Sequence, residues 1–294
     1  MPSPSMRPPS VHPAEVIDIY LQICTDEDKF VNQTVEAFHV AGVGGPALDC
    51  AVGTGFGTIN LLRKGHSIVC SDGSTEMLER FAINCSSAGL VNKSVHARWA
   101  DLGCYFPQIF DLVMCRGNSL AYADTWDGNQ EHGLAPFDLP RLAAHLEGMV
   151  AAIRPGGALL VDVPRTTATI KARQDFNHHG RTEDGRAVSI TETIDTDPER
   201  RLRHWAVDMV IAAEAYRFER SSHLIDTRQV IPILKRLGFR SVVTLPDAGI
   251  REHYDSLLAM NLQTTAAQSA ERSHERYPYQ RDWQCGNPSR ANSR

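Results

Sequence analysis

The stretch from Ala47 to Gly57 constrains the fold more than any other part of this sequence. It reads Ala-Leu-Asp-Cys-Ala-Val-Gly-Thr-Gly-Phe-Gly, and a helix-like run from Thr58 to Lys64 follows it. Glycine lets the backbone turn sharply and approach a ligand where a Cβ atom would collide. A strand, a glycine turn and a helix in this order form the first unit of a nucleotide-binding α/β fold. An ordinary tight turn is the alternative interpretation.

The residues around the glycines distinguish between kinds of nucleotide site. A dinucleotide fingerprint needs G-x-G-x-x-G, but Thr58 stands at the third glycine position, and a P-loop needs a lysine, which first appears at Lys64. Asp-x-Ala-x-Gly-Thr-Gly, with Asp49 before the glycines and Asp72 after the next apolar run, resembles the S-adenosylmethionine (SAM) site of class I methyltransferases. SAM carries an ammonium and a sulfonium that favour carboxylates, and ribose hydroxyls that need acceptors.

The chain around this stretch alternates apolar segments with helix-like segments. Helices are expected at 12–24, from a cap at Thr25 or Asp26 to about residue 41, and at 74–88, 139–154 and 227–237. The first strand is the short apolar run that ends in Asp49 and Cys50, and further strands are expected at 67–71, 95–99, 110–115, 158–163, 241–245 and 256–262. This rhythm predicts a doubly wound, Rossmann-like α/β fold with a mostly parallel seven-stranded sheet. The first two helices would form an N-terminal helical cap over residues 13–45.

The pattern changes after Pro164. Residues 188–194, 204–213 and 215–224 alternate like half-exposed strands, which predicts a small antiparallel β insertion over 165–224 that serves as a lid. We expect one methyltransferase-like domain over 13–263, with disordered segments at 1–12 and 264–294 because these are polar and rich in Pro, Ser, Arg or Asn.

Composition and charge indicate which partners and which cellular compartment to expect. A net charge of −5 argues against a nucleic-acid or anionic-membrane partner. No apolar run approaches the ~18 residues of a membrane-spanning helix, and the first ten residues lack the apolar core of a secretory signal. The seven cysteines are scattered without C-x-x-C pairing, which is typical of reduced thiols and not of a zinc site. We therefore expect a cytoplasmic protein without a metal; a homo-oligomer stays open.

Further motifs follow the glycine stretch in order. They are Asp72-x-Ser74-x-x-Met77-Leu78, Cys115-x-Gly117-Asn118-Ser119-x-Ala121, Glu131-His132 and Arg154-Pro155-Gly156-Gly157. The series resembles the glycine and glycine/sarcosine N-methyltransferases over residues 14–165, and more weakly to residue 262.

The resemblance implies roles for some matched residues and departs from the family at others. Asn118 would help to bind an amino-acid substrate, and Ser119 and Leu120 would border the methyl-transfer site. The family typically has Asp-His-Arg after its last core strand, and that arginine grips the substrate carboxylate. Residues 162–165 read Asp-Val-Pro-Arg, so Arg165 is displaced by one position. Tyr122 replaces the family's usual histidine, which indicates a different acceptor pocket.

Ligands of an open α/β sheet bind beyond the carboxyl ends of its strands. Asp49 would lie near the methionine moiety of SAM and Asp72 would accept from the ribose hydroxyls. Asp101, with Leu102, would meet the adenine, although a turn or capping aspartate explains Asp101 equally well. The residues expected to bind the cofactor are Asp49, Ala51, Gly53, Thr54, Gly55, Asp72, Gly73, Met77, Asp101, Leu102, Cys115 and Gly117.

The sequence thus predicts a SAM-dependent methyltransferase that acts on a small molecule, most simply at an amine nitrogen of an amino-acid-like metabolite. Transfer is an in-line displacement, and a neutral amine needs no strong base. Methylation of oxygen or carbon in a larger, natural-product-like or anionic metabolite would need a base. A SAM-binding sensor without turnover is an alternative of another class, whereas Thr58 and Asp49 disfavour a nicotinamide oxidoreductase.

Candidate residues follow from these alternatives. Those expected to act in catalysis are Tyr122, Asn118 and His223. Those expected to bind the acceptor are Tyr20, Asn118, Ser119, Tyr122, Arg165, Trp205 and Arg217. For Trp205, packing between the insertion and the core is an alternative. The arginines of the insertion either solvate an exposed face or converge on an anionic group of the substrate.

Overall fold

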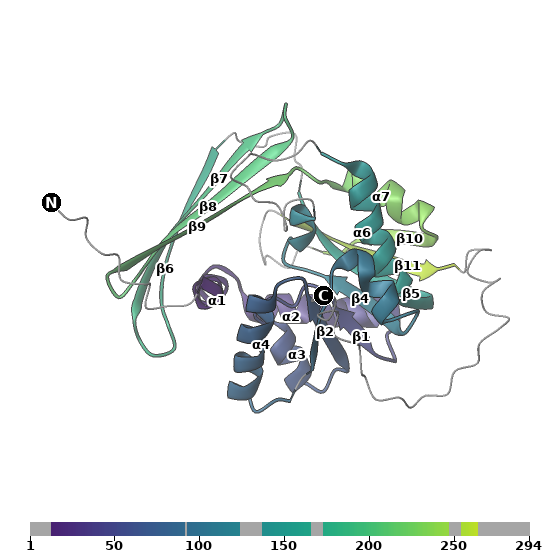
Figure 1. Ribbon diagram of the computed structural model, residues 1–294, viewed down its shortest axis with the longest axis horizontal. Coiled ribbons are helices and arrows are strands. Elements are labelled where there is room, and N and C mark those ends of the chain that lie inside the picture. The colour runs from purple at the N-terminus through teal and green to yellow at the C-terminus, as the bar shows by residue number, and fades with distance from the viewer. Residues whose placement is uncertain (1–12, 92, 124–136, 166–172, 247–253, 264–294) are drawn as a thin grey trace, which may run out of the picture. The chain divides into compact units, whose positions relative to one another are not determined.

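The computed structural model describes residues 13–91, 93–123, 137–165, 173–246 and 254–263, which form two β-sheets with helices around them (Figure 1). The segments 1–12 and 264–294, for which disorder is expected, and the Glu131-His132 motif lie outside the described residues.

Seven strands form the larger sheet. Their bounds are β1 (Ala47–Asp49), β2 (Ile68–Asp72), β3 (Ser94–His96), β4 (Phe110–Cys115), β5 (Ile153–Pro164), β10 (Phe239–Thr244) and β11 (Tyr254–Leu262). They lie in the order β10-β11-β5-β4-β1-β2-β3. Strand β11 pairs antiparallel with β5 and β10, and the pairs among β1 to β5 are parallel. The predicted doubly wound, mostly parallel sheet is confirmed.

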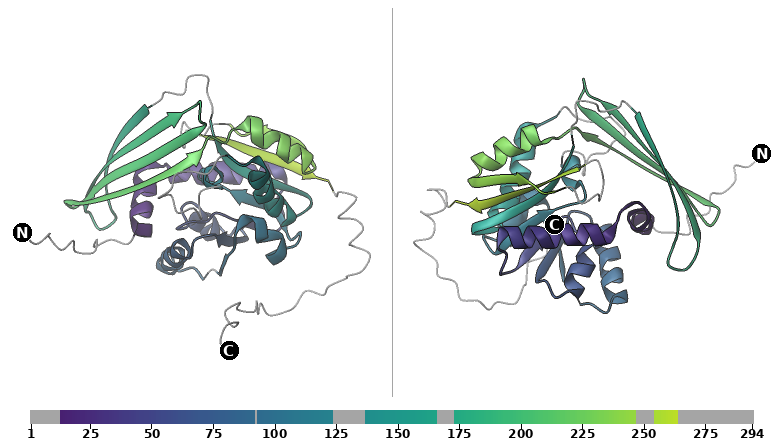
Figure 2. Two further views of the ribbon diagram at one scale, coloured as in Figure 1. Left: turned by 45° about the horizontal axis from the view of Figure 1, so that its top comes forward. Right: turned by 180° about the vertical axis from the view of Figure 1, so that it is seen from behind.

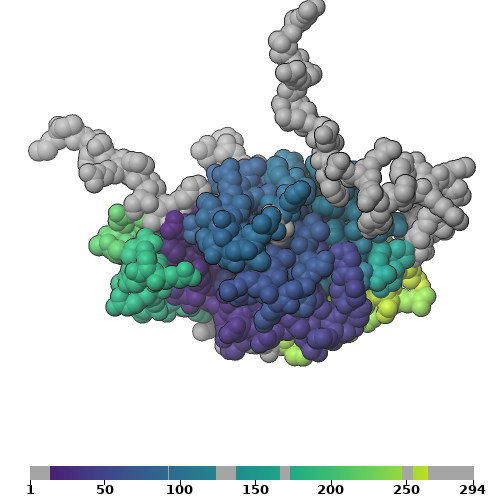
Figure 3. Space-filling view, turned by 90° about the horizontal axis from the view of Figure 1, so that it is seen from below, coloured from purple at the N-terminus to yellow at the C-terminus, as the bar shows by residue number. Residues whose placement is uncertain are grey.

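Helices cover both faces of this sheet (Figure 2). One face packs on α5 (Leu102–Tyr105), α6 (Leu139–Ala151) and α7 (Thr227–Arg236), and the other on α2 (Glu27–Ala41), α3 (Thr58–Arg63) and α4 (Thr75–Ser87). The alternation of side chains along a strand divides its residues between the two cores. Val113 and Cys115 of β4, for example, face the first set of helices, and Leu112 and Met114 face the second. The N-terminal residues, purple and blue, form most of the surface seen from below (Figure 3).

Local signals set several helix ends. The Asp26 side chain caps α2 by accepting from the Lys29 N–H, and Gly42 ends that helix with a φ of 64°. The Ser74 side chain caps α4, and Asp226 with Gln229 forms a capping box at α7. The sequence predicts the ends at Gly42, Ser74 and Asp226, and Asp26 is one of its two candidates for the cap of α2.

The smaller sheet is antiparallel, in the order β6-β7-β8-β9. Its strands are β6 (Arg173–Arg181), β7 (Ala187–Asp197), β8 (Leu202–Ile211) and β9 (Glu214–His223). The sequence predicts the last three and misses β6, because none of the nine residues of this strand is buried and its apolar alternation is absent. Helix α1 (Pro13–Cys24) packs Val16, Ile19 and Tyr20 against this sheet.

Several other element boundaries differ from the sequence prediction by a few residues, among them those of α6 and β3. Helix α6 ends at Ala151 instead of Arg154, and residues 154–157 belong to β5, because Ile153 already pairs with Phe110 ahead of a register shift. Strand β3 ends at His96 instead of Trp99, and Trp99 starts a 3₁₀ turn, η1 (Trp99–Asp101), whose indole donates to the Cys50 carbonyl at 2.7 Å. In the described part of the chain, no helix has the length and apolarity needed to cross a membrane.

Candidate functional site

The glycine turn connects β1 to α3 in a conformation that other residues rarely adopt. Gly53, Gly55 and Gly57 have φ angles of 55°, 97° and 73°. A Cβ atom on Gly55 would lie 2.6 Å from the Phe81 ring, and one on Gly57 would collide with Phe30. Both the backbone conformation and the close packing therefore require glycine at these two positions.

Asp72 holds this turn from the end of β2. One carboxylate oxygen accepts from the Gly53 N–H at 2.8 Å, and the other accepts from the Ser74 N–H at 2.9 Å. Burial raises the pKa of Asp72 above its usual value, and the backbone N–H groups act against this shift. A carboxylate has about four acceptor positions, so Asp72 keeps the capacity to accept from ribose hydroxyls. Its contact with the ribose of SAM stays a prediction.

Asp49 holds the other side of the turn from the end of β1. Its carboxylate accepts from the Thr58 hydroxyl at 2.6 Å and from the Ala51 N–H at 3.2 Å. Burial raises the pKa of Asp49 to about 6. Asp49 therefore ties β1 to the first residue of α3, and Thr58, which excludes the dinucleotide fingerprint, is its partner.

Helix α1 is fastened to the same turn by a residue that the sequence analysis missed. Asp18 is buried and accepts from the Thr54 hydroxyl at 2.7 Å, from Arg80 Nε at 3.1 Å and from Asn84 Nδ2 at 2.8 Å. The available signal was an acid inside the otherwise apolar run from Val16 to Leu21. The N-terminal cap thus contacts the predicted cofactor turn directly.

A second turn follows β4 and carries Asn118. Gly117 and Asn118 have φ angles of 69° and 63°, and the short helix η2 (Ser119–Tyr122) begins immediately after them. Asp162 accepts from the Gly117 N–H at 2.8 Å and from Arg116 Nε at 3.3 Å. The sequence analysis assigned no role to Arg116 or Asp162.

Helix α2 supports this second turn through contacts with Arg116. The buried Arg116 guanidinium donates to Gln33 and to the Phe30 carbonyl and Thr34 hydroxyl, and it lies 4.1 Å from the centre of the Phe30 ring. These contacts use most of the five N–H groups of the guanidinium. Arg116 is consequently a fixed support for the turn and is not available to a ligand.

Asn118 combines burial with an unused acceptor. Its side chain is 2% exposed, and its Oδ1 atom has no hydrogen-bond partner among the described residues. A buried amide oxygen without a partner costs free energy on the order of 1–3 kcal/mol. Such an atom indicates a place where a ligand donor binds.

The predicted acceptor residues fall into two groups. Tyr122 accepts a hydrogen bond of 3.4 Å from the buried Arg203, and His223 is buried at the end of β9, with an Nδ1 atom that has no hydrogen bond in the described part of the chain. These two residues lie on η2 and β9, which contact each other. Tyr20 and Trp205 form an aromatic cluster, with ring centres 5.5 Å apart, which corresponds to the packing alternative for Trp205.

Two predicted arginines have other partners. Arg165 donates to Asp255 at 2.8 Å and to the Tyr254 carbonyl at 2.9 Å. Arg217 lies on the exposed side of β9, where it pairs with Asp208 and Glu219. Neither arginine is positioned with Asn118 by any of these contacts.

The remaining predicted cofactor residues differ in exposure. Leu102 and Cys115 are fully buried in the core between the large sheet and α5 to α7, so their side chains serve packing. Asp101 is exposed in η1. Met77 lies in the first turn of α4, where its N–H donates to the capping Ser74. Contacts of these residues with SAM remain predictions.

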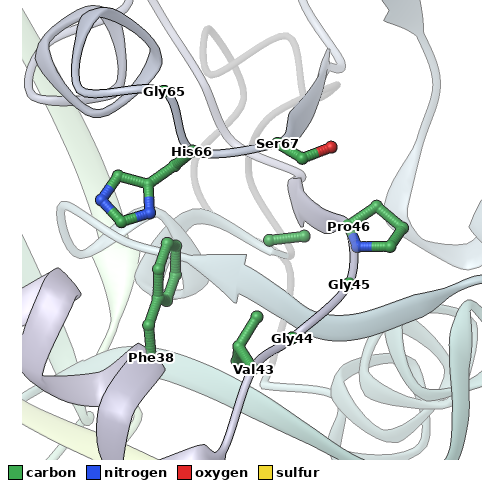
Figure 4. A pocket seen from close by; sticks show the side chains of 9 residues that line it. Phe38, Val43, Gly44, Gly45, Pro46, Gly65, His66 and Ser67 are labelled. Carbon is green, nitrogen blue, oxygen red and sulfur yellow. The ribbon is translucent and has the colours of Figure 1, made fainter.

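An open pocket of about 440 Å³ lies away from this site (Figure 4). Phe38, Pro46, His66 and Ser67 are among the residues that line it. Pro46 and Ser67 precede β1 and β2, so the pocket lies at the amino ends of these strands. Asp49 and Asp72 stand at the carboxyl ends, where ligands of such sheets bind.

Comparison with known proteins agrees with this geometry. Residues 47–157 match the family model described as a methyltransferase domain. The matched segment includes β1, the glycine turn, Asp72 and Asn118. Residues 47–157 are a methyltransferase domain.

The curated proteins that this chain resembles include two N-methyltransferases. A glycine/sarcosine N-methyltransferase of Halorhodospira halochloris is 28% identical over 131 residues, which are 45% of this chain and 44% of the relative. A glycine N-methyltransferase of Rattus norvegicus is 35% identical over 124 residues, 39% of each chain. The matched segments therefore span less than half the length of these curated relatives.

Solved structures show the fold over most of the chain. A S-adenosylmethionine-dependent methyltransferase from Clostridium acetobutylicum is 18% identical with a TM-score of 0.65, and the match covers 85% of this chain and 98% of that one. A sugar N-methyltransferase from a Streptoalloteichus species is 17% identical with a TM-score of 0.65, over 90% and 99% of the two chains. The chain therefore shares its fold with these methyltransferases.

Proposed function

We propose that this protein is a SAM-dependent methyltransferase that methylates an amine nitrogen of a small, amino-acid-like metabolite. The observation that supports this proposal most strongly is the set of hydrogen bonds made by the Asp72 carboxylate. Its two oxygens hold the glycine turn at Gly53 and the start of α4 at Ser74, and it keeps acceptor capacity for ribose hydroxyls. Asp49, on the same strand edge, offers a carboxylate near the cationic end of SAM.

Asn118 would position the acceptor. SAM, when bound, supplies a methyl group that is activated by its sulfonium. The unpartnered Oδ1 atom of Asn118 would accept an N–H of the acceptor amine and so orient its lone pair. An amine that arrives neutral needs no base, and its proton is lost to solvent after transfer. The relatives named as glycine N-methyltransferases support an amino-acid-like acceptor.

A second candidate function is methylation at oxygen or carbon. It is favoured by His223, which is 3% exposed and has an Nδ1 atom without a hydrogen bond among the described residues. An imidazole in this state could take a proton from a hydroxyl or a carbon acid. A sensor that binds SAM without turnover is the candidate of another class.

Mass spectrometry of an acceptor panel distinguishes these functions. The panel contains primary and secondary amino acids, amino sugars and phenols, incubated with SAM and the purified full chain. We expect a gain of one CH₂ on an amine nitrogen. Replacement of Asn118 by alanine should lower kcat/KM at least tenfold at unchanged SAM affinity, and the exposed Asn177→Ala of β6 serves as the control.

Other outcomes of this experiment contradict the proposal. Methyl addition to oxygen or carbon, lost in His223→Ala, would establish the second candidate. Tight SAM binding with no product from any acceptor would favour the sensor.

A further inference from the structure

We propose that Arg203 binds an anionic group of the methyl acceptor, so that the acceptor carries a carboxylate or a similar anion besides its nucleophilic nitrogen. This inference rests on the proposed methyltransferase function. Arg203 lies on β8 with 7% of its surface exposed, and its one hydrogen bond to a described residue is to the Tyr122 hydroxyl at 3.4 Å.

The other arginines near this region are compensated and Arg203 is not. Arg116 pairs with Asp162, Arg201 with Asp226 and Arg217 with Asp208. Among the described residues, Arg203 forms no ion pair. A buried charge without an opposite charge is costly, and proteins normally pair it or use it for a ligand. A bond of 3.4 Å to a neutral phenol compensates little of this cost.

The Arg203 guanidinium nevertheless keeps its positive charge. Burial acts to lower the pKa of Arg203, but the Tyr122 and Tyr254 hydroxyls and Glu192 outweigh it, and the pKa is raised. Glu192, the buried acid on this face of the sheet, is engaged elsewhere, since it accepts from Trp205 Nε1 at 2.8 Å and lies 3.7 Å from His178 Nε2. The guanidinium therefore remains cationic, and within the described part of the chain most of its donors have no partner.

Further polar groups surround this guanidinium. Arg203 is directly opposite Ser222 on β9, and paired residues of antiparallel strands point to the same face of a sheet. The Ser222 hydroxyl is buried without a partner among the described residues. Tyr122 stands four residues after Asn118, whose Oδ1 atom is also unpartnered. The hydrogen bond from Arg203 to Tyr122 thus joins a cationic donor to the turn that would hold the amine.

Arg165 does not supply this function. The resemblance assigns the carboxylate clamp to the arginine after the last core strand, but here that arginine pairs with Asp255 and the Tyr254 carbonyl. The anion would instead be recognised from β8 of the small sheet, by the arginine that donates to Tyr122. An acceptor of this class is zwitterionic or anionic, with its nitrogen at Asn118 and its anion at Arg203.

The alternative is that Arg203 only fastens the small sheet to η2 through Tyr122. Replacement by methionine, which keeps length and removes charge, separates the two roles. If the role of Arg203 is to bind an anionic ligand, the ligand-free protein holds a buried charge without an opposite charge. Arg203→Met removes this charge, and Tm should rise by about 2 °C or more. The exposed Arg173→Met of β6, which breaks the ion pair with Asp175, is the matched control and should leave Tm nearly unchanged.

Small anions give the deciding measurement. Sodium acetate, compared with sodium chloride at equal ionic strength, should raise the Tm of the wild type and of Arg173→Met more than that of Arg203→Met. With a carboxylate-bearing acceptor, Arg203→Met should raise KM at least tenfold, and calorimetry should give the wild-type affinity for SAM.

An acetate effect that is equal in the wild type and in Arg203→Met overturns the inference, as does an Arg203→Met variant that melts lower or fails to fold. The proposed function fails separately, if the wild type does not bind SAM. The acetate comparison uses no SAM and no turnover, so the two failures are distinguishable.

Discussion

At the scale of single residues, two buried acids organise the cofactor side of the site. Asp49 and Asp72 each bind backbone or hydroxyl donors of the glycine turn, and burial raises the pKa of both. The protein thus supplies part of the hydrogen bonds that each carboxylate can accept. This balance makes the stability of the ligand-free protein depend on pH.

We expect Asp49 to destabilise the ligand-free protein as pH rises. Its pKa of about 6 in the folded state exceeds the usual 3.8, so the folded state binds this proton more tightly than the unfolded state. The stabilisation is complete below the unfolded pKa and is lost as pH rises through the folded pKa, by up to about 3 kcal/mol. Urea unfolding between pH 4 and pH 7 measures this loss. Asp49→Asn should become more stable relative to the wild type over this range, whereas parallel curves would contradict the assignment.

The sequence predicts site residues that belong to a local motif, and it misses residues that only the fold brings to the site. Asp49 and Asp72 stand beside glycines in a recognisable spacing, so their position and their place at one sheet edge follow from the motif. Asp18 and Arg203 lie far from the motif in sequence, and only the fold brings them to Thr54 and Tyr122. Charge alone gave the sequence analysis no reason to choose Arg203 over the exposed Arg217.

At the scale of elements, the glycine turn shows that backbone conformation and side-chain packing are two separate reasons for a position to require glycine. Gly53 and Gly55 both have positive φ angles, but a Cβ atom on Gly53 would meet open space, whereas one on Gly55 would lie 2.6 Å from Phe81 and 2.8 Å from Ile59. The first position needs only the left-handed conformation. The second also needs the space that α3 and α4 leave for it.

These two glycines form a matched pair of variants. Gly53→Ala should destabilise the protein by about 1–2 kcal/mol, the cost of the left-handed conformation. Gly55→Ala should cost about 1–3 kcal/mol more, because Phe81 and Ile59 must move. Urea denaturation of both variants checks this order, and equal losses would show that the turn is not packed as described.

The sequence also predicts most elements, for physical reasons that explain the exceptions. The parallel strands β1, β2 and β4 are largely buried runs, and the capped helices carry their own signals at Asp26, Ser74 and Asp226. Strand β6 is found only by pairing with β7, since none of its residues is buried. An edge strand of this kind leaves no period in the sequence.

At the scale of the whole domain, α1 connects the small sheet to the methyltransferase domain. Tyr20 is 1% exposed, with ring centres 5.5 Å from Trp205 and 5.8 Å from Phe218, and Asp18 on the same helix binds Thr54 and Arg80. One face of this helix therefore anchors the insertion, and another holds the glycine turn.

Loss of Tyr20 should weaken the small sheet first. Tyr20→Ala removes a fully buried aromatic side chain, at a cost of about 3–5 kcal/mol. Hydrogen exchange should accelerate more in β7 and β8 than in β4 and β5. Tyr105→Ala, whose partly buried ring on α5 packs against the core of the large sheet, should affect β4 and β5 instead. Equal acceleration in both sheets for Tyr20→Ala would indicate that α1 does not carry the connection.

The most direct test of the central claim is calorimetric titration with SAM of the wild type and Asp72→Ala. We expect the wild type to bind SAM and not NAD. We also expect at least a tenfold loss of SAM affinity in Asp72→Ala, because the ribose acceptor and the support for Gly53 are both removed. The exposed Asp28→Ala is the control and should bind as the wild type does. Unchanged SAM affinity in Asp72→Ala, or binding of NAD in place of SAM, would contradict the account.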